Sequence, residues 1–85
     1  MNIQVRFFAS VREALGVSQE TLVLPVDVAT VGQLRAYLRR RGAAWEAALG
    51  EHKPLRTAFN QHMSSAETPL GEGCEVAFFP PVTGG

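Results

Sequence analysis

Hydrophobic and polar residues alternate over the first part of the chain. Ile3, Val5 and Phe7 fall on one side of an extended segment, with polar residues between them. A period of two is typical of a strand with one buried face, so the pattern predicts a strand over residues 2–9. Phe8 is the exception, because it places an aromatic side chain on the polar side.

A short helical turn and a second strand follow. The turn is predicted at residues 10–15 and ends at Gly16, and the strand is predicted at about residues 20–26. The side chains expected on one face of that strand are Leu22, Leu24 and Val26. The connection is long for a tight hairpin, so the simplest arrangement is an antiparallel pair joined by a loop.

The main helix begins after Thr30, which has the spacing of a capping box with Gln33. The apolar stripe of this helix consists of Val31, Leu34 and Leu38, with Tyr37 at its edge. Three arginines, Arg39 to Arg41, complement the helix dipole at its end, and Gly42 is expected to supply a left-handed exit. The alternative is that this basic run docks an acidic partner.

The remaining elements are shorter. The pattern predicts a helix at residues 43–49, a strand at 54–60, a short strand at 62–65 and a final strand at 74–79. Trp45 is expected to cover the core, and Asn60-Gln61 to begin a turn. Together the elements predict an α+β fold, with one mixed sheet of four to five strands and the main helix across one face.

The last strand runs into a tail. Pro80 and Pro81 fix two φ angles and remove two backbone donors, so strand pairing must stop there. Two glycines without side chains close the chain, which lets the terminal carboxylate enter a narrow pocket. We therefore expect a domain over residues 1–79 and a functional tail over residues 80–85. The alternative is an incidental glycine-rich chain end.

Composition narrows the function classes. The chain has 85 residues, a formal net charge of +0 and one cysteine. This size fits one small domain, and the balanced charge gives no sign of a nucleic-acid or anionic-membrane surface. One cysteine cannot form an internal disulfide, which fits a reducing cytoplasm. No apolar run approaches the roughly 18 residues of a membrane span, and a signal-peptide layout is missing.

Few side chains have catalytic or metal-binding potential. His52 and His62 are too far apart in sequence to read as a metal pair, and only Cys74 could join them, so we expect no metal site. Cys74 itself is predicted to be a small buried hydrophobic residue. The glycines form neither a dinucleotide fingerprint nor a phosphate-binding loop, so any ATP would have to be bound by another protein.

Several stretches resemble one family. The segment Glu75-Val76-Ala77-Phe78-Phe79-Pro80-Pro81-Val82-Thr83-Gly84-Gly85 is similar to the C-terminal signature of the small subunit of molybdopterin synthase, the MoaD family. Shorter matches are Val5-Arg6-Phe7-Phe8-Ala9, Val11-Arg12-Glu13, Asn60-Gln61 and the Pro69-Leu70 turn that leads to Gly73. Cys74 departs from the family, which more usually has Asp there. The resemblance implies a ubiquitin-like β-grasp fold with the first and last strands as parallel neighbours at the sheet centre.

The resemblance also implies a reaction. A ubiquitin-activating-like enzyme would use ATP to adenylate Gly85, and a sulfur donor system would convert the glycyl adenylate into a thiocarboxylate (1-thioglycine). The large synthase subunit, in a heterotetramer, would use two such copies to convert cyclic pyranopterin monophosphate into the dithiolene of molybdopterin. The chain would be a sulfur-donating subunit with no bound cofactor and no catalytic side chains of its own. The tail residues that present Gly85 are Pro80, Pro81, Val82, Thr83 and Gly84.

Alternation and resemblance together place two aromatic residues side by side. If the alternate apolar residues of the first and last strands face the helix, Phe8 and Phe79 both lie on the uncovered face at the root of the tail. We expect a docking surface for the partner there, and the alternative is an ordinary half-exposed sheet face. Three other functions remain open: a sulfur carrier for thiamine or tRNA thiolation, a ubiquitin-like protein modifier, and a plain β-grasp binding module.

Overall fold

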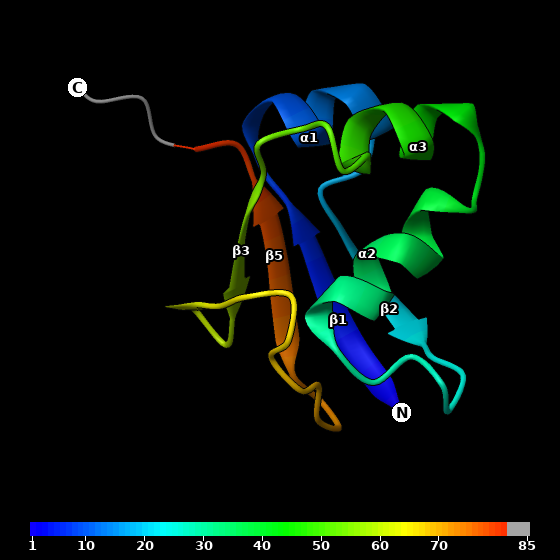
Figure 1. Ribbon diagram of the computed structural model, residues 1–85, viewed down its shortest axis with the longest axis vertical. Coiled ribbons are helices and arrows are strands. Elements are labelled where there is room, and N and C mark those ends of the chain that lie inside the picture. Colours follow the sequence, from blue (N-terminus) through cyan, green and yellow to red (C-terminus); the bar gives the residue numbers. More distant parts are fainter. Residues whose placement is uncertain (82–85) are drawn as a thin grey trace.

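The computed structural model describes residues 1–81, which form a five-stranded sheet with three helices (Figure 1). In chain order the elements are β1 (Asn2–Phe7), α1 (Ala9–Leu15), β2 (Gln19–Val23), α2 (Val31–Arg39), α3 (Ala43–Leu49), β3 (Arg56–Phe59), β4 (His62–Met63) and β5 (Glu75–Phe79). No helix among these residues is long and apolar enough to cross a membrane.

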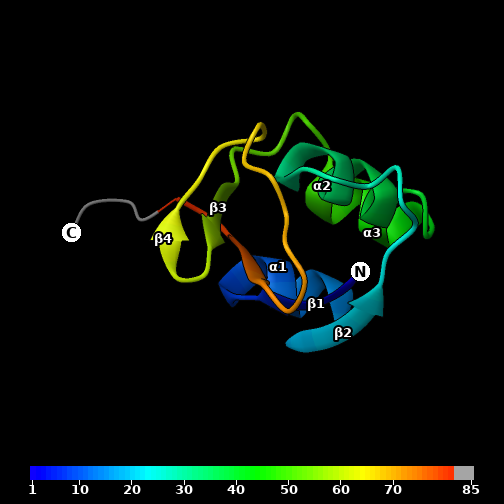
Figure 2. The same ribbon diagram turned by 90° about the horizontal axis from the view of Figure 1, so that it is seen from below.

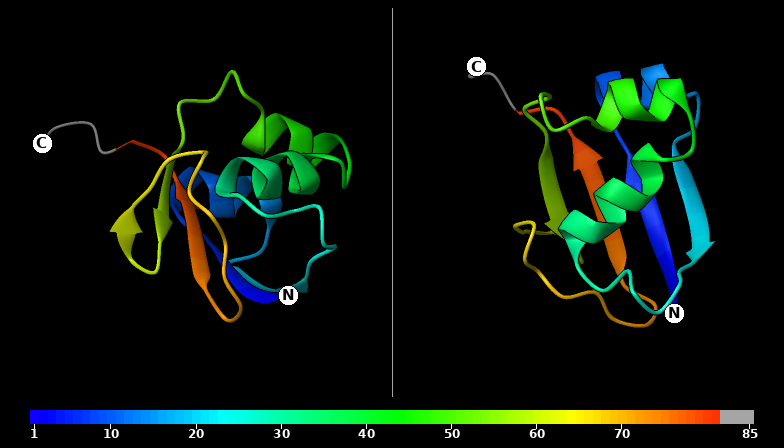
Figure 3. Two further views of the ribbon diagram at one scale, coloured as in Figure 1. Left: turned by 60° about the horizontal axis from the view of Figure 1, so that its bottom comes forward. Right: turned by 45° about the vertical axis from the view of Figure 1, so that its right-hand side comes forward.

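The sheet has the strand order β2-β1-β5-β3-β4. β1 pairs antiparallel with β2 and parallel with β5, and β5 pairs antiparallel with β3. The first and last strands are therefore parallel neighbours at the sheet centre, and the expected β-grasp fold is confirmed. Helix α2 crosses one face of the sheet, over β1 and β5 (Figure 3).

The core lies between α2 and this face of the sheet. The predicted faces are confirmed, because Ile3, Val5 and Phe7 of β1 are buried, as is the stripe of α2. Within the core, the rings of Phe7 and Phe78 join the two central strands and stack with centroids 6.1 Å apart. Trp45 of α3 meets the ring of Phe7 edge-on at 5.7 Å and covers the core as predicted.

The start of α2 is confirmed and its end is not. The Gln33 backbone N–H donates to Thr30 Oγ1 at 3.2 Å, and Gln33 Oε1 accepts from the Thr30 N–H at 3.2 Å, which completes the capping box. The prediction that Gly42 ends this helix is wrong, because α2 ends at Arg39 with a right-handed C-cap. Gly42, at φ 148°, is instead the N-cap of α3, a backbone conformation that favours glycine.

The bounds of the strands also differ from the prediction: β1 ends at Phe7 and β4 at Met63, both earlier than expected, and the differences at β2 and β3 have identifiable causes. Val26, expected on the buried face of the second strand, is 96% exposed. β2 stops at Val23, and a turn closed by the hydrogen bond from the Val28 N–H to the Pro25 carbonyl at 3.1 Å puts Val28 into the core instead. β3 begins later than predicted because the chain before it is held in a loop by Arg35, as described below.

Candidate functional site

The tail leaves the sheet at the carboxyl end of β5. The strand ends at Phe79, and Pro80 and Pro81 follow outside it, as their missing backbone donors predict. Val82, Thr83, Gly84 and Gly85 lie outside the described residues, so the roles predicted for them stay predictions. The residues around the root of the tail, at the end of β5, are described by the structure.

Phe8 lies beside this root. Its backbone N–H donates to the Phe78 carbonyl at 3.1 Å, which extends the parallel ladder of β1 and β5 by one residue. Because partners in a ladder have their side chains on the same face, Phe8 and Phe79 both lie on the face opposite α2. Both side chains are half-buried. The predicted placement is therefore confirmed, and their role in docking stays a prediction.

A shallow groove of about 350 Å³ runs along this face of the sheet from the tail root. Its lining residues are Arg6, Phe8, Ala58, Gln61, Glu75, Ala77 and Phe79. Figure 2 shows the molecule from below, with α2 and α3 on one side of the strands. Alternation and the family resemblance together predicted a docking role for only the two aromatic residues of this set.

The turn after β3 shapes the far side of the groove. Asn60 and Gln61 have φ of 49° and 70°, the left-handed values of a tight hairpin turn between β3 and β4. The Asn60 N–H donates to the Glu75 carbonyl at 2.8 Å, and Asn60 Oδ1 accepts from the Glu75 N–H at 2.8 Å. The predicted turn is confirmed, and these two bonds fix it against the start of β5, which brings Gln61 to the groove.

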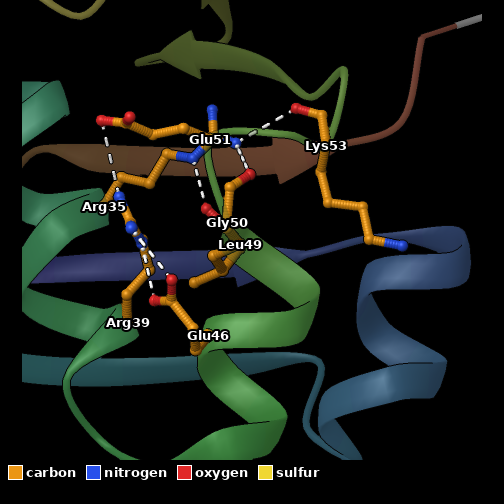
Figure 4. Close-up of polar contacts among 7 residues, drawn as sticks. All are labelled: Arg35, Arg39, Glu46, Leu49, Gly50, Glu51 and Lys53. Atoms are coloured by element: carbon orange, nitrogen blue, oxygen red, sulfur yellow. Dashed lines mark hydrogen bonds and ion pairs between the residues drawn. The ribbon is translucent and has the colours of Figure 1, made fainter.

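Arg35 of α2 holds the loop that leads into β3 (Figure 4). Its Nε donates to the Leu49 carbonyl at 2.6 Å, and its Nη2 donates to the carbonyls of Gly50 at 2.6 Å and Lys53 at 3.2 Å. These bonds satisfy carbonyl groups at and after the end of α3, which has no further helical turn to bond them. Arg35 thereby sets the entry of β3, the strand that supplies Ala58 to the groove.

Two members of the basic run are paired within the chain. Arg39 forms a two-pronged contact with Glu46, at 2.8 and 3.0 Å, and Arg41 forms one with Glu20, with both distances 2.8 Å. The hydrogen bonds from Arg41 are the main cause of a lowered pKa at Glu20. These pairs join α2, α3 and β2, and they leave Arg40 as the member of the run for which the described residues supply no ion pair. The structure therefore favours a role for the basic run within the chain over the alternative that it docks an acidic partner.

The other candidate residues are not gathered at the groove. His52 and His62 are exposed, in the loop after α3 and in β4 respectively. Cys74 is 4% exposed and its backbone bonds to Gly71 and Gln4, so it is the small buried residue that the sequence predicts. Its neighbours in the core are apolar, so the structure gives it no chemical role. The terminal carboxylate of Gly85, which the sequence predicts to be the reactive group, lies outside the described residues.

Comparison with protein families gives a match over almost the whole chain. A model described as the ThiS family matches residues 5–85. Curated relatives are the molybdopterin synthase sulfur carrier subunits of Escherichia coli and Haemophilus influenzae, 45% and 42% identical, each covering 98% of this chain and 99% of its own length. The small archaeal modifier protein 3 of Haloferax volcanii is 34% identical and covers 100% of both chains.

Solved structures agree with the fold. The crystal structure of SAMP1 from Haloferax volcanii superposes with a TM-score of 0.80 at 24% identity, with 100% of both chains covered. A chain in the protein–protein complex of subunits 1 and 2 of molybdopterin-converting factor from Helicobacter pylori superposes with a TM-score of 0.66 at 26% identity, again over 100% of both chains. Relatives of this chain thus include a protein with a known partner subunit.

Proposed function

Because this chain belongs to the ThiS family, we propose that it is the sulfur carrier subunit of a molybdopterin synthase. The observation that carries the proposal is the 45% identity to a molybdopterin synthase sulfur carrier subunit over 98% of the chain. The family resemblance predicted from the sequence is thereby confirmed. The fold agrees with this function, since it gives the domain one helix-covered face and one free face next to the tail.

The chemistry is assigned to the carboxyl group of Gly85. An ionised α-carboxylate, with a pKa of about 3.3–3.7, is a poor electrophile at neutral pH because it already carries negative charge. Transfer of AMP from ATP to one carboxylate oxygen releases pyrophosphate and makes AMP a leaving group. A sulfur nucleophile then displaces AMP, and the product is a thiocarboxylate on Gly85. In the synthase this group transfers its sulfur to the cyclic pyranopterin monophosphate, and the carboxylate is regenerated.

Each step of this chemistry requires a partner protein. We propose that a ubiquitin-activating-like enzyme supplies the adenylation, that a separate donor system supplies the sulfur, and that the large synthase subunit holds the substrate. The subunit complex from Helicobacter pylori supports a large-subunit partner. We propose that the two kinds of subunit assemble as a heterotetramer. We place the protein in the cytoplasm, because its one cysteine is a free, buried thiol.

A second candidate function is a ubiquitin-like protein modifier. The observation that favours it is the 34% identity to small archaeal modifier protein 3 over the full length. The higher identities are to sulfur carrier subunits, which places the carrier first. Adducts joined through Gly85 to lysines of other proteins in cell extracts would favour the modifier, since a carrier leaves no such bond.

Loading with sulfur is directly measurable. Incubation with the cognate activating enzyme, ATP and a sulfur donor should raise the intact mass by the difference between one sulfur and one oxygen atom. Fragmentation should locate the change at Gly85, because the terminal carboxylate is the group that the activating enzyme is proposed to adenylate. Omission of ATP is the control, and it should leave the mass unchanged. A C-terminal fragment without added mass in the complete mixture would contradict the carrier function.

The aromatic end of the groove should contribute to binding of the large subunit. We expect Phe79→Ala to weaken that binding by about 1–3 kcal/mol, because a truncated aromatic anchor loses its contacts in the interface. Isothermal titration calorimetry with the purified large subunit measures the loss. Thermal unfolding of the variant serves as the control for folding. An unchanged affinity would exclude Phe79 as an anchor.

A further inference from the structure

Arg6 is held in an unusual way on the free face of the sheet. Its Nε is the one buried side-chain nitrogen or oxygen without a hydrogen-bond partner among residues 1–81. Its guanidinium carbon lies 5.0 Å from the centroid of the Phe8 ring, in the groove at the tail root. A buried polar group without a partner costs about 1–3 kcal/mol, and more when it is charged. The free chain therefore leaves one guanidinium nitrogen of Arg6 without a hydrogen-bond partner among the described residues.

The strand register arranges the groove in three rows. Phe8 and Phe79 form the row at the tail root, Arg6 lies opposite Ala77 in the next row, and Glu75 lies in the third. Rows are about 6.6 Å apart, two residues along a parallel strand. No ion pair of the described part of the chain involves Arg6 or Glu75. The groove thus presents an apolar row, a cation and an anion in a fixed order.

The row of Arg6 has room for a visiting side chain. Ala77 lies beside Arg6 on β5, and Ala58 lies beside Ala77 on β3. All three residues line the groove, and the two alanines are the small side chains of that row. A side chain that enters over the alanines meets the guanidinium, which has five donors and no acceptor. A carboxylate matches this fork of donors best, since it can accept two parallel hydrogen bonds.

We propose that Arg6 determines the specificity of the docking groove by taking a carboxylate from the large synthase subunit, beside an apolar side chain that contacts Phe8 and Phe79. The assignment rests on the proposed function, which makes this face the docking surface. The carboxylate compensates the charge that the chain leaves unpaired. The fixed order of the rows then permits one orientation of the partner, because a reversed partner would bring its carboxylate to Glu75.

A charge series at position 6 tests the proposal. Binding of the purified large subunit is measured by calorimetry for the wild type, Arg6→Lys, Arg6→Gln and Arg6→Glu, at low and high salt. We expect Arg6→Glu to bind at least about tenfold more weakly and Arg6→Lys to lie in between. The salt dependence of binding should fall for Arg6→Gln, because one charge pair is lost. The matched control is Arg40→Glu, an exposed arginine at the end of α2, and it should bind like the wild type.

Folding and function are followed separately. Circular dichroism melting should show no loss of stability in Arg6→Gln, because that side chain packs on the free face and not in the core. A charge swap supplies the positive evidence: an Asp→Arg or Glu→Arg variant of the large subunit that restores binding to Arg6→Glu identifies the carboxylate.

Two results would overturn the role of Arg6. Equal affinities of Arg6→Glu and Arg40→Glu for the large subunit, with weak binding of Phe79→Ala, would show that Arg6 has no role in docking and that the aromatic residues do. Unchanged binding of Arg6→Glu, Arg40→Glu and Phe79→Ala would also exclude the groove as the docking surface. The proposed function fails by a different measurement, the absence of a mass increase at Gly85, and the binding series is decided independently of it.

Discussion

Deletion of Gly85 should abolish sulfur transfer to the pyranopterin substrate and leave the folded domain unchanged. The deletion moves the terminal carboxylate back by one residue, about 3.3–3.6 Å of extended chain, from the position that it must reach inside both partners. A reacting atom misplaced by 1 Å can already cost about 10²-fold in rate, so the loss should be close to complete. Formation of molybdopterin by the reconstituted synthase measures it.

The control separates the position of the carboxylate from its chemistry. A full-length chain whose terminal carboxyl group is an amide keeps the length of the tail and loses the oxygen that AMP must join. It should therefore bind the large subunit like the wild type and give no product. Undiminished product from either altered chain would show that the sulfur travels on another group, and it would end the carrier proposal.

Phe78→Ala should strongly destabilise the domain, although the neighbouring Phe79→Ala should not. The Phe78 side chain is 0% exposed and stacks on Phe7 at the centre of the sheet. Truncation of a buried phenylalanine costs about 3–5 kcal/mol, which is a large share of the roughly 5–15 kcal/mol that stabilises a small domain. Urea denaturation followed by circular dichroism measures the change in the free energy of unfolding.

The two phenylalanines are a matched pair on opposite faces of one strand. Phe79→Ala removes the same atoms from the half-buried face, so its free energy of unfolding should change far less while its binding to the large subunit falls. Similar destabilisation by the two substitutions would mean that the free face contributes to the core. That result would also weaken the use of Phe79→Ala as a probe of docking.

The sequence predicts the frame of this fold because its signals are local. Alternation in β1 and β5, the capping box at Thr30 and the turn at Asn60 each depend on residues close together in the chain. Two errors have different origins. Val26 faces solvent because of a local turn, closed between Pro25 and Val28, that the alternation pattern does not reveal. The late start of β3 depends on a distant contact, because Arg35 of α2 holds the preceding loop.

The candidate site was predictable only in part for the same reason. Alternation places Phe8 and Phe79 on the polar side of their strands, and parallel pairing then brings them together. Ala58 and Gln61 join the groove only because β3 flanks β5, which no local pattern reveals. Arg6 reads as an ordinary solvent-facing residue of an alternating strand, and its unsatisfied nitrogen becomes visible only with the neighbouring rings and strands in place.

The central position of β5 has a mechanical consequence. A pull on the tail is applied along the axis of a strand that is hydrogen-bonded on both sides, to β1 and to β3. Such a load acts on both ladders in shear, so several bonds must break together before the strand can move. If the tail is bound in the channel of a partner, we therefore expect a pulling force to slide the tail out of the channel. The domain should stay folded under that force.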